Sequence, residues 1–528
     1  MKTKTIIYIL IFLLASVSFL SGQEQAVPTG TIYVIRNIEF DVIGHSRPYM
    51  LTYHGEFKEG ERITGKDNLD KYISRKTQLL INQRVLEDVR IEYTTGEEDD
   101  GTVPVDLLVH IKDSRNFIIL PYPKYDSNDG LSITLKARDY NFLGTMSALR
   151  VDLGYRQDSD EKVFNFVVDS DTPFRAFGLN WVFNFDHTLS YTLGNPLYYQ
   201  NVTGLSVELP WRKTTFTVGF NHYLTINEEI SDENLDLYDY NNEFYDPYGS
   251  VELFTSWKIP LGIEIGDFGD VSYTPKVSGR LNYPYSNLDE PRKPVTTFSH
   301  SIGFGRTDWI GNYRKELSAS LSNSYSWYFD RSDAPLQITM SAGAVFHWPF
   351  SKYLGFSSRF DYRQWWQWSS RNGDWLPYYY AGDRLRGVID EDLRADVMLS
   401  LNLDLPIRFL RFWPSEWFKN PKLEFFNLEV FVSPFWDMAL LRGPYNDLKA
   451  NPFEGTKFSF SDMVSTIGLE VIVYSGYFRS LRLRGSIGYN FDKDKDTCCV
   501  VHYLKSIPRK WKVVPKWDEI YIGLDLFY

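Results

Sequence analysis

A long acidic loop is the clearest group of side chains in this sequence that could bind a ligand. The loop runs from Asn227 to Pro247 and is rich in carboxylates, whose oxygens suit a hard cation such as Ca²⁺ when they cluster. The spacing of an EF-hand is absent, so we favour a solvated surface loop over a calcium site. The carboxylates are those of Glu228, Glu229, Asp232, Glu233, Asp236, Asp239, Glu243 and Asp246.

A tryptophan cluster, Trp365, Trp366 and Trp368, is the second such group. Its rings could bind a carbohydrate or a client protein. An aromatic girdle at a membrane interface accounts for the same residues, and we favour that interpretation.

The sequence lacks the motifs of the common enzyme classes. The eight histidines are scattered without the spacing of a metal site, and neither a glycine-rich phosphate loop nor a G-x-S-x-G turn occurs. Cys498 and Cys499 are the only cysteines, and adjacent cysteines rarely bridge to each other. A net charge of -12 argues against nucleic acid as a partner. We therefore expect no enzymatic activity, no metal and no cofactor.

The first residues of the chain have the pattern of an export signal, which precedes the elements that would form a binding site. Lys2 and Lys4 precede an apolar run from Ile6 to Leu20. This is the pattern of a signal peptide over residues 1–22, with an uncleaved anchor as the alternative. No later apolar run approaches the ~18 residues of a membrane helix. If the mature protein enters a membrane, it must therefore do so as a closed barrel.

Residues 31–113 have the pattern of a small α/β domain. Apolar residues at helical spacing lie within Asp67–Gln83, and a weaker helical signal lies between Ser46 and Tyr53. Strand patterns lie on both sides of these helices, and an acidic hairpin loop precedes the last strand. The expected strands are Tyr33–Val42, Val85–Tyr93 and Val103–Ile111.

From about residue 115 to Tyr528, short alternating segments recur. The clearest runs from Leu317 to Trp327 and places serines on one face and mostly apolar residues on the other. Aromatic residues make up 17% of the chain, as lipid-facing strands require. At roughly 25 residues per strand with its connection, the region predicts a transmembrane antiparallel β-barrel of about 16 strands. A count of the individual segments gives nearer ~18, so two of them would be halves of one bent strand.

The last strand ends in a pattern typical of exported barrels. Tyr521-x-Gly523-x-x-Leu526-x-Tyr528 resembles the C-terminal targeting signal of bacterial outer-membrane barrels. Such a signal presents a strand edge for pairing and an aromatic residue for the membrane interface. A chain that simply ends in a strand is the alternative.

A loop motif, a strand motif and a turn motif together point to one family. Leu385-Arg386-Gly387 lies in a loop that five strand candidates follow, and Phe435-Trp436-Asp437-Met438 lies on one of those strands. These residues resemble the R-G-[FY] loop and the F-x-D-x-G strand of the BamA superfamily, which includes TamA and the two-partner secretion transporters. Further matches, spread over residues 31–528, are Asn141-Phe142-Leu143-Gly144, Asp404-Leu405-Pro406 and Lys58-Glu59-Gly60-Glu61.

The resemblance implies a single POTRA domain followed by a surface-antigen-type barrel. In that family the loop folds back into the lumen and its arginine pairs with an acidic residue of the wall, which makes Asp437 the expected partner of Arg386. A guanidinium matches a carboxylate as a planar fork, so the pair would pin the loop. A solvated loop arginine is the alternative. Val388 and Ala439 depart from the motifs, where the family has an aromatic residue and a glycine.

The resemblance also implies an insertase or translocase of the bacterial outer membrane, with its N-terminal domain in the periplasm. Its partners would be unfolded or extended client proteins, outer-membrane lipid and lipopolysaccharide, and accessory lipoproteins. A passive or structural channel with a residual periplasmic domain is the second interpretation. A barrel enzyme such as a phospholipase is the third, but it needs Ser, His and Asn or Asp together on the wall, and we see no such group. Insertion and secretion of the client both stay open.

Overall fold

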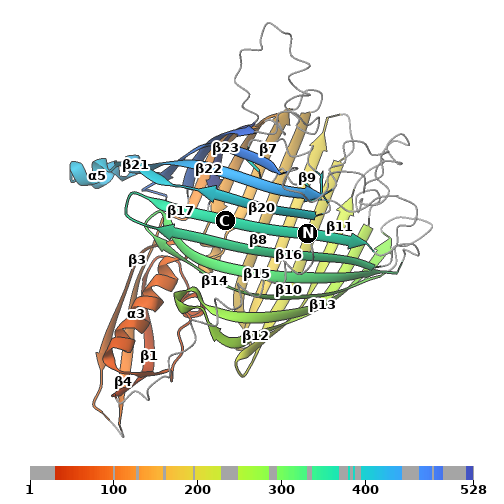
Figure 1. The fold of residues 1–528 in the computed structure, drawn as a ribbon. Coiled ribbons are helices and arrows are strands. Elements are labelled where there is room, and N and C mark those ends of the chain that lie inside the picture. The colour runs from red at the N-terminus through yellow and green to blue at the C-terminus, as the bar shows by residue number, and fades with distance from the viewer. Residues whose placement is uncertain are drawn as a thin grey trace.

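A computed structural model gives the fold of this chain, and Figure 1 shows its ribbon. It describes residues 30–526 except for 99–100, 127–129, 158–161, 194–196, 227–247, 285–293, 330–335, 368–378, 381–384, 387–393, 396, 443–462, 479–480 and 491–518. The expected signal peptide and the acidic loop lie outside the described residues, as do Gly387, Val388 and Tyr528.

The N-terminal residues form a four-stranded sheet with two helices. The strands lie in the order β2-β1-β4-β3, with β1 parallel to β4 and the other neighbouring pairs antiparallel. Each element expected from the sequence is present to within two residues at either end, and β2 is an addition. In chain order the elements are β1 (Ile32–Ile43), α2 (Pro48–His54), β2 (Arg62–Thr64), α3 (Lys66–Ile81), β3 (Leu86–Thr95) and β4 (Thr102–Asp113).

The core of this α/β domain follows from the alternation of β4. Val105 and Val109 are fully buried together with Leu69 and Leu80 of α3. Leu108, on the other face of β4, is 36% exposed. Burying each such side chain stabilises the domain by about 1.5–3 kcal/mol. None of the helices within the described ranges has the length and apolar character needed to cross a membrane.

The strands after residue 116 form a closed antiparallel barrel, in which β25 returns to β5. They are β5 (Phe117–Asp126), β6 (Gly130–Asp139), β7 (Leu149–Gln157), β8 (Lys162–Ala176), β9 (Leu179–Thr192), β10 (Leu197–Trp211), β11 (Thr214–Ile226), β12 (Tyr248–Glu264), β13 (Asp270–Pro284), β14 (Val295–Ile310), β15 (Tyr313–Tyr328), β16 (Leu336–Pro349), β17 (Gly355–Gln367), β20 (Val397–Asp404), β21 (Ile407–Phe412), β22 (Leu428–Arg442), β23 (Val464–Ser475), β24 (Leu481–Asn490) and β25 (Glu519–Leu526).

One wall position is occupied by two segments, because β20 and β21 are halves of a bent strand. β22 pairs first with β20 and then with β21, on either side of Pro406. Proline has no N–H for a strand ladder, so the pairing is interrupted there. Among the described residues, nineteen barrel segments therefore fill eighteen wall positions. The nineteen segments are close to the count of ~18 made from the sequence, two of which were expected to be halves of one bent strand. The eighteen wall positions exceed the first estimate of about 16 strands.

Tight turns join the strands at one end of the barrel. Phe177 and Gly178 link β8 to β9, and their φ angles of 54° and 77° are those of a hairpin whose two central residues are both left-handed. We call this the short-turn end. The α/β domain lies at this end of the barrel (Figure 1), where it contacts the β6–β7 and β14–β15 turns.

Candidate functional site in the barrel lumen

The described part of the arginine loop lies against the inner wall of the barrel. A short pairing of β18 (Tyr379–Tyr380) with β19 (Arg394–Ala395) ties the two sides of the loop together. Leu385 is 2% exposed and packs in an apolar cluster with Met398 and Ala439. Ala439 stands where the family motif has glycine, and its methyl group belongs to this contact.

Arg386 is bound by three carboxylates of the wall. Its Nε and Nη2 donate to Oδ2 and Oδ1 of Asp437, both at 2.8 Å, which is the bidentate fork. Its backbone N–H also donates to Asp437 Oδ2, at 3.0 Å. Nη1 donates to Asp404 Oδ1 at 2.7 Å and to Glu470 Oε2 at 3.3 Å. The loop is therefore attached to β20, β22 and β23 at once.

Strand alternation places these carboxylates on the lumen face. Trp436 of β22 is 46% exposed and faces outward. Its neighbours Phe435 and Asp437 must then face inward, because successive side chains of a strand point to opposite faces. Their register partners on β20 are Asp404 and Asn402. Asp437 is fully buried at this position, so its charge depends on Arg386 for compensation.

An aromatic ring and a second arginine complete the cluster. The guanidinium of Arg386 lies over the ring of Phe435, with Cζ 3.9 Å from the ring centre, in the geometry of a cation–π contact. Glu470 also binds Arg484 of β24. The contacts of Arg386 thus continue through Glu470 to the strand next to β25.

The electrostatics of the cluster favour a fixed loop position more than stability of the barrel. Burial alone lowers the pKa of Arg386, but its contacts with Asp437 and Asp404 outweigh burial, and the net pKa is raised. A buried ion pair contributes little net stability, because both charges lose their water. Removing one partner, in contrast, costs about 3–5 kcal/mol. The main effect of the cluster is therefore to hold the loop in one position on the wall.

The structure brings Arg386 and Asp437 together, and it adds two carboxylates to the pair. We expected Asp404 only as part of an acidic strand end, and we did not expect Glu470. Glu470 is the one charged residue within Val464–Ser475 and alternates in phase with Thr466 and Gly468. A search for carboxylates on the inward face of a predicted strand could have found it.

Gly468 gives a test of the aromatic contact. A Cβ at this position would lie 2.3 Å from the Phe435 ring and 2.1 Å from the backbone oxygen of Ile487. Gly468→Ala should therefore displace the ring below Arg386, strain the β23–β24 pairing at Ile487 and cost about 1–3 kcal/mol. We expect a lower temperature for loss of the folded, heat-modifiable band in SDS gels. Gly279→Ala is the matched control, since a Cβ there meets nothing within 4 Å. Equal behaviour of the two variants would contradict the proposed packing.

A second cluster joins the α/β domain to the barrel at the turn between β6 and β7. Asn141 Nδ2 donates to Ser46 Oγ at 2.9 Å and to Asp113 Oδ2 at 3.1 Å. Its Oδ1 accepts from the backbone N–H of Met146 at 2.9 Å. Asp113 also accepts from the backbone N–H of His45, at 2.6 Å. Asn141, the first residue of the turn motif found in the sequence, thus holds both its own turn and the N-terminal domain.

The last residue of the same motif makes room for this joint. Gly144 has a φ of +75°, and a Cβ there would lie 2.0 Å from the backbone oxygen of His45. Its own backbone oxygen accepts from the N–H of Arg47 at 3.0 Å. Arg47 Nε donates to the backbone oxygen of Leu143 at 2.8 Å. Glycine is required here by both the backbone conformation and the close approach.

The C-terminal end of α3 reaches a different turn, between β14 and β15. Asn82 Nδ2 donates to Asp308 Oδ1 at 2.9 Å, and Asn82 Oδ1 accepts from the backbone N–H of Trp309 at 3.0 Å. Arg84 donates to the backbone oxygen of Gly311 at 3.3 Å. The α/β domain is therefore fixed to the rim of the barrel at separate points.

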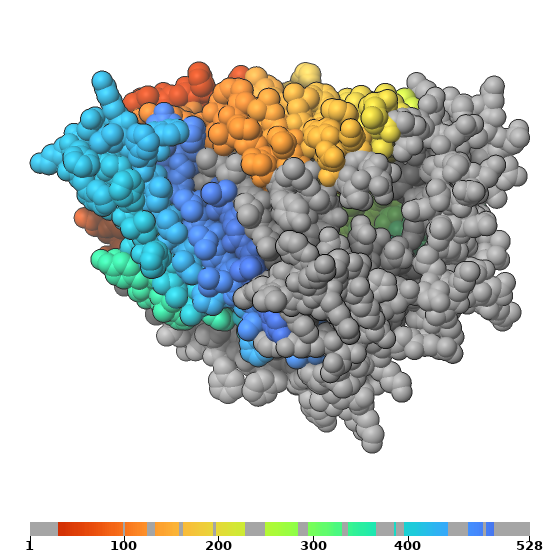
Figure 2. Space-filling view, turned by 90° about the horizontal axis from the view of Figure 1, so that it is seen from above, coloured from red at the N-terminus to blue at the C-terminus, as the bar shows by residue number. Residues whose placement is uncertain are grey.

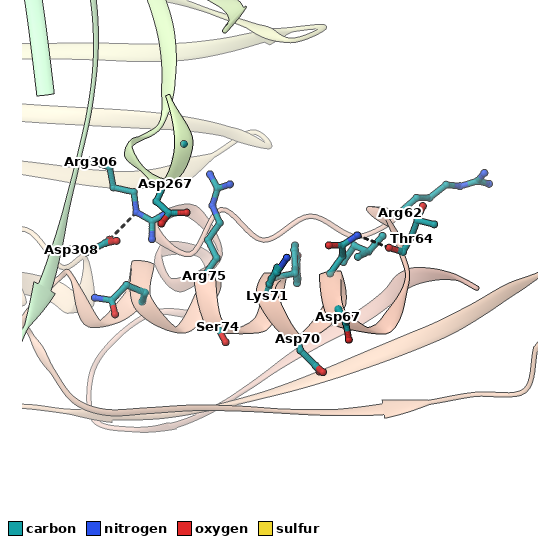
Figure 3. A pocket seen from close by; sticks show the side chains of 15 residues that line it. Arg62, Thr64, Asp67, Asp70, Lys71, Ser74, Arg75, Asp267, Arg306 and Asp308 are labelled. Carbon is teal, nitrogen blue, oxygen red and sulfur yellow. Dashed lines mark hydrogen bonds and ion pairs between the residues drawn. The ribbon is translucent and has the colours of Figure 1, made fainter. Parts of the chain in front are cut away.

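A polar cavity of about 1200 Å³ opens between α3 and the rim (Figure 3). Lys71 and Arg75 of α3 line one side, and Asp267 and Asp308 of the barrel line the other. β2, at the edge of the sheet, also borders the cavity. This mixture of charges suits a hydrated, polar segment better than an apolar ligand.

The C-terminal strand expected from the sequence is β25, which contains Tyr521, Gly523 and Leu526. β25 pairs with β24 along its whole length. With β5 it shares a single register pair among the described residues, Ile522 with Tyr125. We call this boundary between β25 and β5 the seam. It is the least paired boundary of the described wall.

The remaining candidates do not join the lumen cluster. Trp365 and Trp366 belong to β17, and Trp368 lies outside the described residues together with Cys498 and Cys499. Within the described ranges, no three or more His, Cys, Asp or Glu side chains lie where they could hold a metal ion.

These features define the class: a closed antiparallel β-barrel with an α/β domain at its short-turn end and an arginine loop bound to the inner wall. The chain is similar to BamA from Haemophilus ducreyi lacking POTRA domains 1–3, at 14% identity, covering 93% of this chain and 84% of that one, with a TM-score of 0.36. It is also similar to CdiB from Acinetobacter baumannii, at 13% identity, 94% and 74% coverage and a TM-score of 0.44. CdiB from Escherichia coli is similar at 9% identity, with 96% of this chain and 92% of that one covered and a TM-score of 0.42.

Similarities of this size assign no activity to the chain. No protein-family model matches it, and no curated protein matches it.

Proposed function

We propose that this chain is an outer-membrane barrel that inserts or exports client proteins. The observation that carries the proposal is the contrast between two parts of the wall. Arg386 binds β20, β22 and β23 together through three carboxylates. The seam, two strands further on, is held by one described register pair. A wall section held together by these ion pairs, next to a boundary with one described register pair, suits a barrel that opens sideways.

In the proposed mechanism, the seam opens and a client strand pairs with the exposed edge. Strand exchange replaces one set of backbone hydrogen bonds by another, so it proceeds without a nucleotide or a cofactor. The Arg386 cluster keeps the strands on one side of the seam in register while it opens. The chain has no proposed enzymatic role.

The α/β domain is proposed to be a POTRA-like domain that receives the client in the periplasm. Short turns face the periplasm in barrels of this kind, which would place the domain on that side. The outer edges of β2 and β3 are free of strand partners within the described sheet. An extended segment can add to such an edge through its backbone. Outer-membrane lipid, lipopolysaccharide and accessory lipoproteins are the further partners proposed.

A disulfide across the seam tests the mechanism. In a Cys498→Ser, Cys499→Ser background, Tyr125→Cys with Ile522→Cys should form a bridge, because paired Cα atoms lie within disulfide range. Cells depleted of the native protein would carry this variant, and the outer-membrane proteome would be measured. We expect the oxidised form to lower client levels about tenfold, with recovery in reductant, because a locked seam offers no edge.

The control bridge joins two strands far from the seam. Ser326→Cys with Gln337→Cys lies in the β15–β16 register and should leave client levels unchanged. A passive channel makes the opposite prediction, since its depletion would leave other barrels and exported proteins at normal levels. That result, or full activity with the seam locked, would exclude the proposed mechanism.

A further inference from the structure

The connection between β21 and β22 differs from the other described turns at the short-turn end. Residues 413–427 form a projection that contains α5 (Pro414–Trp417) and η5 (Pro421–Phe426). Other hairpins at this end are shorter, and that of Phe177 and Gly178, for example, turns in two residues. In Figure 1 α5 extends from the rim, and in Figure 2 the cyan residues of this region stand out at one corner of the molecule.

The surface of the projection is aromatic. Phe418 is 72% exposed, Phe425 60%, Trp417 58% and Phe426 55%. Trp417 packs edge-on against Phe412 of β21, with ring centres 5.1 Å apart. Large aromatic side chains gathered in this way on a surface indicate an interaction site.

Hydrogen bonds and ion pairs fix the projection to itself and to the adjoining strand and turn, so the aromatic face belongs to a defined structure. Asn427 is 5% exposed, donates to Ser415 Oγ at 2.7 Å and accepts from the Ser415 N–H at 3.3 Å. Arg411 forms a bidentate pair with Glu416, at 2.8 and 3.0 Å. The N–H of Gly476, in the next turn, donates to the Asn427 oxygen at 2.7 Å. These contacts hold the aromatic rings outward.

The projection continues the outward face of the barrel wall. Along β20 and β21 the outward positions are apolar, and Leu405, Ile407, Leu410 and Phe412 are each 37–44% exposed. Phe409 is the extra residue of a bulge in this strand, and it is 75% exposed. If the wall faces lipid, the apolar outward face of these strands leads directly to the exposed aromatic residues of 413–427.

Other turns of the same rim also carry exposed aromatic residues. Phe177 is 96% exposed, Phe350 61%, Trp211 57% and Tyr353 55%. Aromatic residues gather at the level where hydrocarbon meets the headgroups. Two cations of the projection, Lys419 and Lys422, are exposed beside its rings. Aromatic rings next to lysines suit a phospholipid surface, where the rings enter the acyl boundary and the lysines meet phosphate.

We infer that residues 413–427 bind the phospholipid surface of the leaflet at the short-turn end, as an in-plane anchor beside the strands that lead to the seam. The projection fixes the rim of β21–β23 to the membrane, so movement at the seam is not transmitted to that rim. The inference requires that the barrel lies in a membrane, and it does not depend on what the barrel transports.

Site-specific fluorescence tests this anchor in the full chain. In the Cys498→Ser, Cys499→Ser background, Phe418→Cys and, separately, Phe425→Cys would carry an environment-sensitive label. Both side chains are mostly exposed, so neither substitution removes core packing. The protein would be reconstituted in vesicles of phosphatidylethanolamine and phosphatidylglycerol. We expect blue-shifted emission and at least about twofold quenching by nitroxide lipids placed near the headgroups.

Glu97→Cys is the control, because Glu97 lies exposed at the hairpin tip of the α/β domain and should show aqueous emission without quenching. Aqueous emission at both Phe418 and Phe425 would overturn the inference. So would emission that shifts only when an unfolded client barrel is added, which would make the surface a protein-docking site. A shift that depends on the protein-to-lipid ratio would instead indicate contact with a second copy and would also overturn it.

Discussion

Arg386→Ala should release the inward loop from the wall while the barrel still folds. The substitution leaves Asp437 fully buried without its fork and removes the link between Asp404 and Glu470. Leaving a buried charge unpaired costs about 3–5 kcal/mol. This cost lowers the ratio of wall-bound to released loop by ~100-fold or more. We expect a heat-modifiable barrel in the outer membrane, a loss of client assembly of about tenfold or more, and more frequent open events in single-channel recordings.

One further variant separates the fork from the charge, and a second serves as the control. Arg386→Lys keeps the positive charge and loses the bidentate geometry, so we expect poor recovery of activity. Arg212→Ala removes an exposed arginine of the β10–β11 turn, and it should behave like the native protein. Full activity of Arg386→Ala, or equal loss in Arg212→Ala, would show that the pinned loop is not needed.

Regular alternation made the fold readable from the sequence. Residues 317–327 repeat with a period of two, and the structure places them on β15. The α/β domain could be predicted for the same reason, since β4 alternates cleanly and α3 has helical spacing. Short elements were harder. β2 has three residues and is defined by pairing with β1, a contact that no local pattern reports.

The candidate site was predictable only where a motif marked it. Arg386 and Asp437 lie in motifs, whereas Glu470 reaches the cluster through the register of β22 with β23. Register depends on the closure of the whole barrel, so it is a long-range property. The aromatic projection was missed for a similar reason. Phe418 and Phe425 look like core residues in sequence, and their exposure follows from a connection that leaves the wall.

The second large effect is expected at the joint between the domain and the barrel. Gly144→Ala places a methyl group 2.0 Å from the His45 oxygen, and that neighbour is backbone, which cannot rotate away. The left-handed φ of +75° adds about 1–2 kcal/mol of strain for alanine. The joint must then separate, with loss of the hydrogen bond from the Arg47 N–H to the Gly144 oxygen. We expect amide hydrogen exchange of residues 45–47 to accelerate by about tenfold or more.

Gly178→Ala is the control that isolates the clash from the strain. Gly178 has nearly the same φ, +77°, on another turn of the rim, but a Cβ there meets nothing within 4 Å. It should therefore carry the conformational cost and leave exchange at residues 45–47 unchanged. The Asn82 and Arg84 contacts lie at a different turn, so exchange of the amides in α3 should stay slow in both variants. If Gly144→Ala accelerates exchange throughout the α/β domain, the substitution unfolds the domain instead of opening the joint. If it accelerates exchange nowhere, the turn motif does not hold the domain to the barrel.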